Sequence, residues 1–283
     1  MQVRASFLAA LAAGAASLAC SSPGSTSVNA TVLGPGSDAD LPAFVLVHGW
    51  SNDARVWSEV APLLAECARV IVLDLPGHGA SPPAEDGDFS MDAMARAIGE
   101  AMDEHDVARA ILIGHSNGTH AVRQFYRLFP ERVIGLVIVD GSLRAFSGLA
   151  EFVDEMARRL EGPERDAAVA ETFEGLPLGT MSDAHRALIH EMLRATPGPV
   201  QAATARATLQ DGLYAEDPIR VPVLLVMANS PFWDDEYRAF VRGLCPDLES
   251  EWWTGVSHWL MMQKPRRFAD AVLGWADLRF AAR

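Results

Sequence analysis

The sequence predicts a doubly wound α/β fold, in which helices cover both faces of a mostly parallel sheet. Five short apolar runs are rich in β-branched residues and show no polar alternation: Phe44–Val47, Val70–Leu73, Ala110–Ile113, Val133–Val139 and Val221–Met227. Strands that are buried on both faces produce such continuous runs. Segments with helical spacing lie between them, including Met91–Asp103 and Thr119–Phe129. Strands that alternate with helices are typical of a parallel sheet between two helical layers.

The alternation stops over residues 142–216. This segment contains amphipathic helical patterns, such as Leu149–Leu160 and Asp183–Ala195, separated by Gly and Pro and without a strand-like run. We expect it to form a helical cap, inserted into a core built from residues 41–141 and 217–283. Ligands of open parallel sheets bind at the carboxyl ends of the strands, so the cap should lie over the functional site.

The amino terminus has the pattern of a signal peptide. A short positive segment precedes an Ala-rich apolar run that ends at residue 19, which is too short to span a bilayer. Ser-Leu-Ala-Cys at 17–20 resembles a bacterial lipobox, although Ser17 stands where Leu is usual, so Cys20 is the expected lipidation site. Residues 21–40, rich in Ser and Gly, then form a flexible tether. The chain is predicted to be exported, either as a cell-envelope lipoprotein or as a secreted or periplasmic protein.

Charge and cysteine content exclude several classes of partner. The net charge of −14 is spread along the chain and repels a phosphate backbone, so no nucleic acid is expected as a partner. Besides Cys20 there are only Cys67 and Cys245, which we expect to be unpaired, buried thiols. No His, Cys and Asp residues have metal-ligand spacing, and no glycine-rich phosphate cradle is present. The sequence therefore implies neither a metal nor another cofactor.

A candidate nucleophile follows the run Ala110–Ile113. Residues 114–118 read Gly-His-Ser-Asn-Gly and lead into a predicted helix. A serine in a sharp strand-to-helix turn has its hydroxyl lifted clear of the sheet, and the flanking glycines avoid clashes. The same turn directs the backbone N–H of Asn117 at the reaction centre. Ser116 is thus the expected nucleophile, and Asn117 an expected oxyanion-hole residue.

With this motif, the chain from about residue 41 onward resembles the α/β-hydrolase superfamily, in its serine hydrolase and esterase-like branch. His48-Gly49-Trp50 resembles the HG turn after an early strand, and residues 74–81 (Asp-Leu-Pro-Gly-His-Gly-Ala-Ser) resemble the D-x-P-G-x-G-x-S loop. The resemblance implies that the cap is inserted after the sixth strand of the family's sheet. It gives the backbone N–H of Trp50 a place in the oxyanion hole, gives His48 an orienting role and makes the 74–81 loop structural.

The general base is expected at His258. A serine hydroxyl needs a base to remove its proton. His115 and His120 are close to the serine in sequence, but the geometry of the turn directs their side chains away from its exposed face. His258 lies near the carboxyl terminus, after a strand-like segment at Leu248–Trp253. The family places its base in such a position.

The triad acid has two candidate positions. The family most often places it after the strand that ends here near Met227, but no carboxylate stands at the expected place, and Asp234 and Asp235 follow only some residues later. Some branches, the haloalkane dehalogenases among them, take the acid from the end of the preceding strand, where this chain has Asp140. We favour Asp140 and keep Asp234 or Asp235 as the alternative.

These residues predict a cofactor-free serine hydrolase that cleaves a carboxylic ester of a small molecule through an acyl-enzyme. Trp50 and Phe146 are the expected substrate-binding side chains, and Leu149, Phe152 and Phe173 are further apolar candidates in the cap. Serine in place of aspartate at the turn argues against dehalogenase and epoxide hydrolase activity. Two alternatives remain: cleavage of lactone, amide or carbon–carbon bonds with the same triad, and a non-catalytic envelope binding protein on the same scaffold.

Overall fold

The computed structural model describes residues 28–35, 41–175 and 181–280, which contain a seven-stranded sheet with the order β1-β3-β2-β4-β5-β6-β7. Every neighbouring pair is parallel except β1 with β3. The strands are β1 (Ala30–Leu33), β2 (Ala43–Val47), β3 (Val70–Leu73), β4 (Ala110–His115), β5 (Val133–Val139), β6 (Val223–Ala228) and β7 (Leu248–Trp253). Their parallel register brings the carboxyl ends of β2 to β7 to one edge of the sheet.

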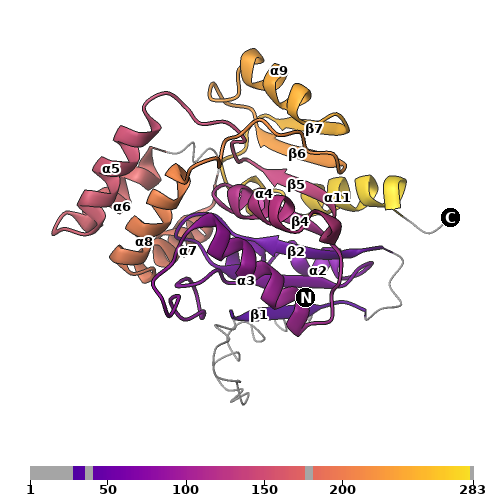
Figure 1. Cartoon of the computed structure of the whole chain (residues 1–283), viewed down its shortest axis with the longest axis horizontal. Coiled ribbons are helices and arrows are strands. Elements are labelled where there is room, and N and C mark those ends of the chain that lie inside the picture. The colour runs from indigo at the N-terminus through magenta and orange to yellow at the C-terminus, as the bar shows by residue number, and fades with distance from the viewer. Residues whose placement is uncertain (1–27, 36–40, 176–180, 281–283) are drawn as a thin grey trace.

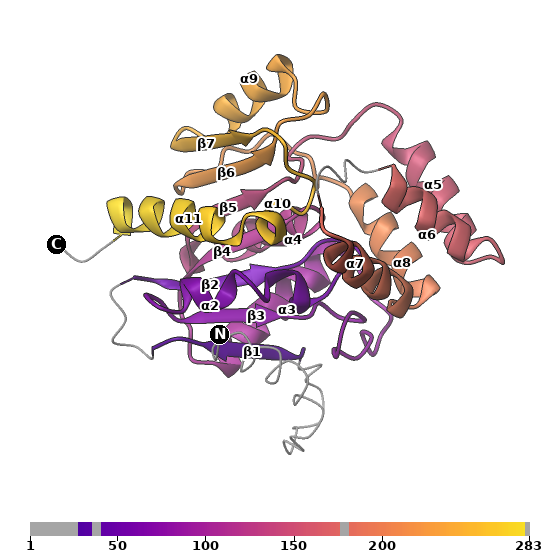
Figure 2. The ribbon, with the colours of Figure 1, turned by 180° about the vertical axis from the view of Figure 1, so that it is seen from behind.

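Helices cover both faces, which confirms the predicted fold class (Figure 1). On one face pack α3 (Met91–Glu104), α4 (Gly118–Leu128) and α9 (Asp235–Leu244). On the other pack α2 (Ala61–Leu64), α10 (Leu260–Gln263) and α11 (Pro265–Phe280), which Figure 2 shows from behind.

Strand β5 shows why the strand sequences are apolar at successive positions. Val137 and Val139 face the core that contains α11, whereas Leu136 and Ile138 face the core that contains α3 and α4. Successive side chains of a strand point to opposite faces, and here both faces are covered. Each position along the strand is therefore selected for apolar character.

Between β5 and β6 the chain forms helices that gather beside one end of the sheet (Figure 1). They are α5 (Leu149–Leu160), α6 (Arg165–Glu174), α7 (Asp183–Ala195) and α8 (Gly198–Arg206). No strand is assigned among the described residues of the predicted cap segment, 142–175 and 181–216. The cap is joined to the core by hydrogen bonds between Gln201 on α8 and the turn after β2, one donated by Trp50 Nε1 and one by Gln201 Nε2.

The prediction of a flexible tether over residues 21–40 is wrong for residues 28–33. Ala30–Leu33 forms β1, which pairs antiparallel with β3, and Val28 is buried. Asn29 donates through Nδ2 to Asp74 Oδ2 at 2.9 Å and through its backbone N–H to Ser81 Oγ at 2.7 Å. The strand is only four residues long and is flanked by a Ser- and Gly-rich sequence, so its strand pattern was not recognised. Its pairing partner, β3, is distant in sequence.

The predicted signal peptide and Cys20 lie outside the described residues. Within the described ranges, no helix is both long enough and apolar enough to cross a membrane. Cys67 and Cys245 are both free, and Cys245 is buried as expected. Cys67 is exposed, contrary to the expectation, because it lies in the turn between α2 and β3.

Candidate active site

Ser116 lies at the sharp turn between β4 and α4. Its φ of 52° is in the left-handed region, which a residue other than Gly adopts at an energetic cost. The turn is held by the Ser116 N–H, which donates to the Val139 carbonyl on β5 at 2.9 Å. A Cβ at Gly114 would approach the Gly118 carbonyl to 2.6 Å, and one at Gly118 would lie 2.5 Å from the His48 carbonyl. Glycine at both positions lets the turn close against β2.

His258 and Asp140 meet at the same edge of the sheet. His258 lies on the loop after β7, and Asp140 directly follows β5. The Nδ1–H of His258 donates to Oδ2 of Asp140 at 2.7 Å, and the two side chains are 12% and 6% exposed. In the tautomer with the proton on Nδ1, Nε2 presents a lone pair that can accept a proton.

The carboxylate of Asp140 is oriented by two further donors. Its Oδ1 accepts from the Ala228 N–H at 2.9 Å and from Nε1 of Trp233 at 3.0 Å. Ala228 ends β6, and Trp233 lies in the loop between β6 and α9. These bonds fix the plane of the carboxylate so that Oδ2 faces the imidazole.

The alternative carboxylates serve a different role. Asp234 is the N-cap of α9, where its Oδ1 accepts from the Tyr237 N–H at 2.8 Å, and Asp235 is the exposed first residue of that helix. Among the carboxylates considered from the sequence, the structure brings Asp140 to His258. In the described part of the chain, no hydrogen bond links Ser116 to His258; such bonds are often loose before substrate binds.

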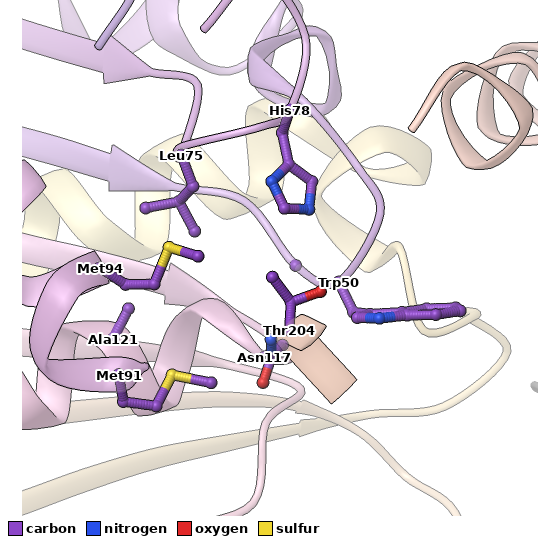
Figure 3. A pocket seen from close by; sticks show the side chains of 9 residues that line it. Trp50, Leu75, His78, Met91, Met94, Asn117, Ala121 and Thr204 are labelled. Atoms are coloured by element: carbon purple, nitrogen blue, oxygen red, sulfur yellow. The ribbon is translucent and has the colours of Figure 1, made fainter. Parts of the chain in front are cut away.

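The backbone N–H groups of Trp50 and Asn117 lie beside the serine turn. Neither donates to another residue within the described ranges, which leaves both available to a ligand. Trp50 and Asn117 also line one cavity together with Gly49 (Figure 3). A Cβ on Gly49 would come within 3.0 Å of Ser116 Cβ, so the HG turn and the serine turn are in direct contact.

Cap residues hold this turn in place. The indole Nε1 of Trp50 donates to the Gln201 carbonyl at 2.9 Å, and Nε2 of Gln201 donates to Ser51 Oγ at 3.2 Å. Gln201 is fully buried, and Ser51 has a φ of 53°. On the other side, Nε1 of Trp259, the neighbour of His258, donates to Asn52 Oδ1 at 2.9 Å.

The other histidines near the site are neutral supports. His48 donates from Nδ1 to the Gly49 carbonyl at 2.8 Å and accepts at Nε2 from the Leu75 N–H at 2.9 Å. His115 donates from Nε2 to the His258 carbonyl at 3.0 Å, below the loop that carries the candidate base. Burial lowers the pKa of His48 and holds the pKa of His115 well below its ordinary value.

The apolar side chains expected in the substrate pocket are divided between the surface and the core. Phe146 and Phe152 are 55% and 51% exposed and form an edge-to-face pair with ring centres 6.0 Å apart. Phe173 is buried against Trp259, with ring centres 5.7 Å apart, and Leu149 is half-buried. Of the expected pair of substrate-binding residues, Trp50 lines the cavity beside the serine turn, and Phe146 lies on the cap surface.

Trp233 and Gln201 could not be identified as site residues from the sequence. Trp233 contacts Asp140 across a loop, and Gln201 reaches the turn after β2 from a cap helix 150 residues away. Neither belongs to a motif, and only the folded structure brings them to the site. No group of His, Cys, Asp and Glu among the described residues is arranged to hold a metal ion.

This fold is that of an α/β-hydrolase, and the chain belongs to that family. The model of the alpha/beta hydrolase fold matches residues 42–265. In sequence the chain is 30% identical over 243 residues to the biotin biosynthesis bifunctional protein BioHC of Cellvibrio japonicus, covering 82% of this chain and 47% of that protein. It is 39% identical over 120 residues to the dihydrolipoyllysine-residue acetyltransferase component of the acetoin cleaving system of Pseudomonas putida, covering 42% of this chain and 30% of that one. The chain thus spans less than half the length of these two relatives.

Solved structures have the same fold at low sequence identity. A thermophilic esterase from Thermogutta terrifontis is similar with a TM-score of 0.80 and 23% identity, over 92% of this chain and 97% of that one. The enol-lactonase from Burkholderia xenovorans LB400 has a TM-score of 0.74 and 18% identity, over 88% and 95% of the two chains. At these identities the likeness concerns the fold alone.

Proposed function

We propose that the chain hydrolyses a carboxylic ester, with Ser116 as nucleophile, His258 as general base and Asp140 as the acid that orients the base. The observation that carries the proposal is the 2.7 Å contact between His258 and Asp140, at the same sheet edge as the strained serine turn. A buried carboxylate on Nδ1 fixes the tautomer in which Nε2 can accept the serine proton.

The reaction then has two steps. Ser116 Oγ attacks the ester carbonyl carbon while its proton moves to His258 Nε2. The N–H groups of Trp50 and Asn117 donate to the oxyanion that forms. The tetrahedral species collapses, and the alcohol leaves with the proton from Nε2. Water attacks the acyl-enzyme in the same manner, which releases the acid and restores the Ser116 hydroxyl.

Hydrolysis of p-nitrophenyl esters from acetate to decanoate tests this function. We expect wild-type protein to release p-nitrophenol and Ser116→Ala to lose that activity by at least about 10³-fold. Ser182→Ala is the matched control, because Ser182 caps α7 through its hydroxyl and is exposed. It should cost about 1 kcal/mol of stability without loss of activity. If the wild-type protein is folded but hydrolyses none of these esters, simple esters are not its substrates.

Lactones, amides and carbon–carbon bonds next to a carbonyl could be cleaved with the same residues. A lactone is a cyclic ester, so the same oxyanion hole would serve it. Measured beside the p-nitrophenyl series, γ-butyrolactones and p-nitroanilides separate these reactions from open-chain ester cleavage. Binding of the same compounds without turnover would instead favour a binding protein on this scaffold.

We also propose that the chain is exported and lipidated at Cys20, which rests on the Ala-rich amino-terminal run and the lipobox-like segment at 17–20. Expression of the full chain with radiolabelled palmitate in a bacterial host tests this. Label in the wild type and none in Cys20→Ala supports lipidation. Unlabelled protein released by the host after cleavage would indicate a secreted or periplasmic form.

A further inference from the structure

A small cavity beside the proposed oxyanion hole contains an unused hydrogen-bond acceptor. Its lining comes from the turn after β2, the loop after β3, α3, the start of α4 and α8 (Figure 3). The residues are Gly49, Trp50, Leu75, His78, Met91, Met94, Asn117, Ala121 and Thr204. The centre of a water-sized group can move through about 10 Å³ of it, which is the room that a single water or hydroxyl oxygen needs.

The acceptor is Nε2 of His78. The other ring nitrogen, Nδ1, lies 3.0 Å from the Pro76 carbonyl, which can only accept, so Nδ1 carries the proton. His78 is 2% exposed, and its Nε2 is enclosed without a hydrogen-bond partner in the described part of the chain. A buried acceptor left unpaired is costly, so a ligand that donates to it gains more than it would from an exposed group.

A second enclosed polar atom belongs to Asn117, which also lines the cavity. Oδ1 of Asn117 is also enclosed and has no partner among the described residues. Rotation of the amide by 180° would put Nδ2 in its place, so Asn117 can either accept from a hydroxyl or donate to its lone pair. Thr204 Oγ1 already donates to the Val200 carbonyl at 2.8 Å, which leaves it only acceptor capacity.

The rest of the lining disfavours charged hydrogen-bond donors. No lining residue carries a charge at neutral pH, because burial lowers the pKa of His78 to about 3. An ammonium group would be desolvated there without a counter-charge, which is strongly unfavourable. Met91, Met94 and Leu75 supply the apolar walls of the cavity, which has room for one oxygen and not for a carbon chain. A neutral hydroxyl satisfies both the size and the chemistry of the cavity.

We propose that this cavity binds a hydroxyl group on the acyl part of the substrate, at the second or third carbon. This rests on the proposed esterase function. The leaving alcohol must lie beside His258 to receive its proton, and His258 is not among the residues that line the cavity. The carbonyl oxygen would lie between the N–H groups of Trp50 and Asn117, so the cavity that both residues border can be reached by a hydroxyl on a carbon close to the carbonyl.

Methyl esters of butanoate, 2-hydroxybutanoate and 3-hydroxybutanoate, each enantiomer separately, test the proposal. We expect wild-type kcat/KM to be about tenfold higher for a hydroxy ester than for butanoate, the factor that one well-formed hydrogen bond supplies. His78→Phe should bring the ratio to about one. Ala121→Val, which fills the cavity without altering His78, should do the same. Ala97→Val, a buried alanine of α3 outside the lining, should leave the ratio unchanged.

Binding of the same five compounds to Ser116→Ala protein is then measured by calorimetry, which needs no turnover. Tighter binding of a hydroxy ester, lost in Ser116→Ala/Ala121→Val, supports the cavity even if no ester is hydrolysed and the proposed function fails. Hydrolysis without hydroxyl preference overturns the proposal, since the cavity then serves at most a water, and leaves the esterase function in place. Binding without hydroxyl preference also overturns the proposal, whether or not any ester is hydrolysed. Equal preference in wild type and both cavity variants overturns it as well.

Discussion

Asp140 and His258 are 118 residues apart in the chain, and their side chains meet at 2.7 Å. One follows β5 and the other follows β7, so the contact spans β6 and depends on the parallel register of all three strands. Asp140 has a φ of 44°, in the left-handed region. The backbone there is held in an unfavourable conformation that carries the carboxylate to the imidazole.

Asp140→Asn and Asp234→Asn should separate the two candidate acids. We expect Asp140→Asn to lower kcat by roughly 10³ to 10⁴, because an amide at this position favours the wrong tautomer of His258. Asp234→Asn should retain activity, since Asn also caps helices well. Ester hydrolysis and circular dichroism on both variants check this. Loss of activity in Asp234→Asn with little loss in Asp140→Asn would reverse the assignment.

Trp233→Phe should weaken the base without removing it. The variant deletes the Nε1–H that donates to Asp140 Oδ1 but keeps the Ala228 N–H on the same oxygen. We expect kcat to fall about five- to tenfold with KM little changed, because one hydrogen bond to a charged group is lost. Trp252→Phe is the control: its indole donates to Ser250 on edge strand β7. Equal effects of the two substitutions would deny Trp233 a positioning role.

Gln201→Leu should reduce activity and stability together. The variant leaves Ser51 Oγ without this donor and Arg165 Nε without its acceptor at 3.0 Å. We expect a loss of about 1–3 kcal/mol in the free energy of unfolding and a lower kcat, because the turn that positions the Trp50 N–H loses its side-chain bond to the cap and keeps only the indole bond to the backbone carbonyl of residue 201. Gln124→Leu is the control: Gln124 is a half-buried residue of α4 whose side chain donates to Asp92 rather than to the turn after β2. Full kcat in a destabilised Gln201→Leu would mean that the cap acts on folding alone.

The buried neutral histidines should make the fold sensitive to mild acid. Burial lowers the pKa of His48, His78 and His115, that of His78 to about 3. The unfolded chain therefore binds protons near pH 6.5 while the folded chain does not. The free energy of unfolding should be constant above this pH and fall below it, by up to about 1.4 kcal/mol per pH unit for each histidine.

Urea unfolding at intervals from pH 8 to pH 4.5 measures this slope. His78→Phe removes one of the titrating groups, so its slope below pH 6.5 should be shallower by about one proton than that of the wild type. A slope that is the same in both proteins would show that His78 is protonated in the folded state.

Local patterns predicted the core strands and the sharp turn at Ser116, because each is encoded by neighbours in sequence, whereas the choice of His258 as candidate base depended on the family resemblance. The bounds of β3 and β5 match the apolar runs, since a strand buried on both faces leaves an unbroken signal. The choice between Asp140 and Asp234 depended on a family comparison, because the contact with His258 is set by strand order.

What the sequence could not predict depends on contacts between distant segments. The cavity beside Asn117 is enclosed by α3, α8 and two loops. No sequence motif predicts that Nε2 of His78 is left without a hydrogen-bond partner among the described residues. Strand β1 was missed for the same reason: Thr31 and Val32 are a weak strand signal until β3 provides a partner. Trp233 and Gln201 act through single hydrogen bonds to residues far along the chain.

The position of β1 decides where a recombinant chain can safely begin. A chain begun at residue 41 would lack the strand that covers β3, and the exposed backbone groups of β3 would become a template for pairing between molecules. It would also lose Asn29, which holds Asp74 and Ser81 in the loop that carries His78. Soluble, active protein should therefore be prepared from a chain that starts before Val28, whatever processing removes upstream.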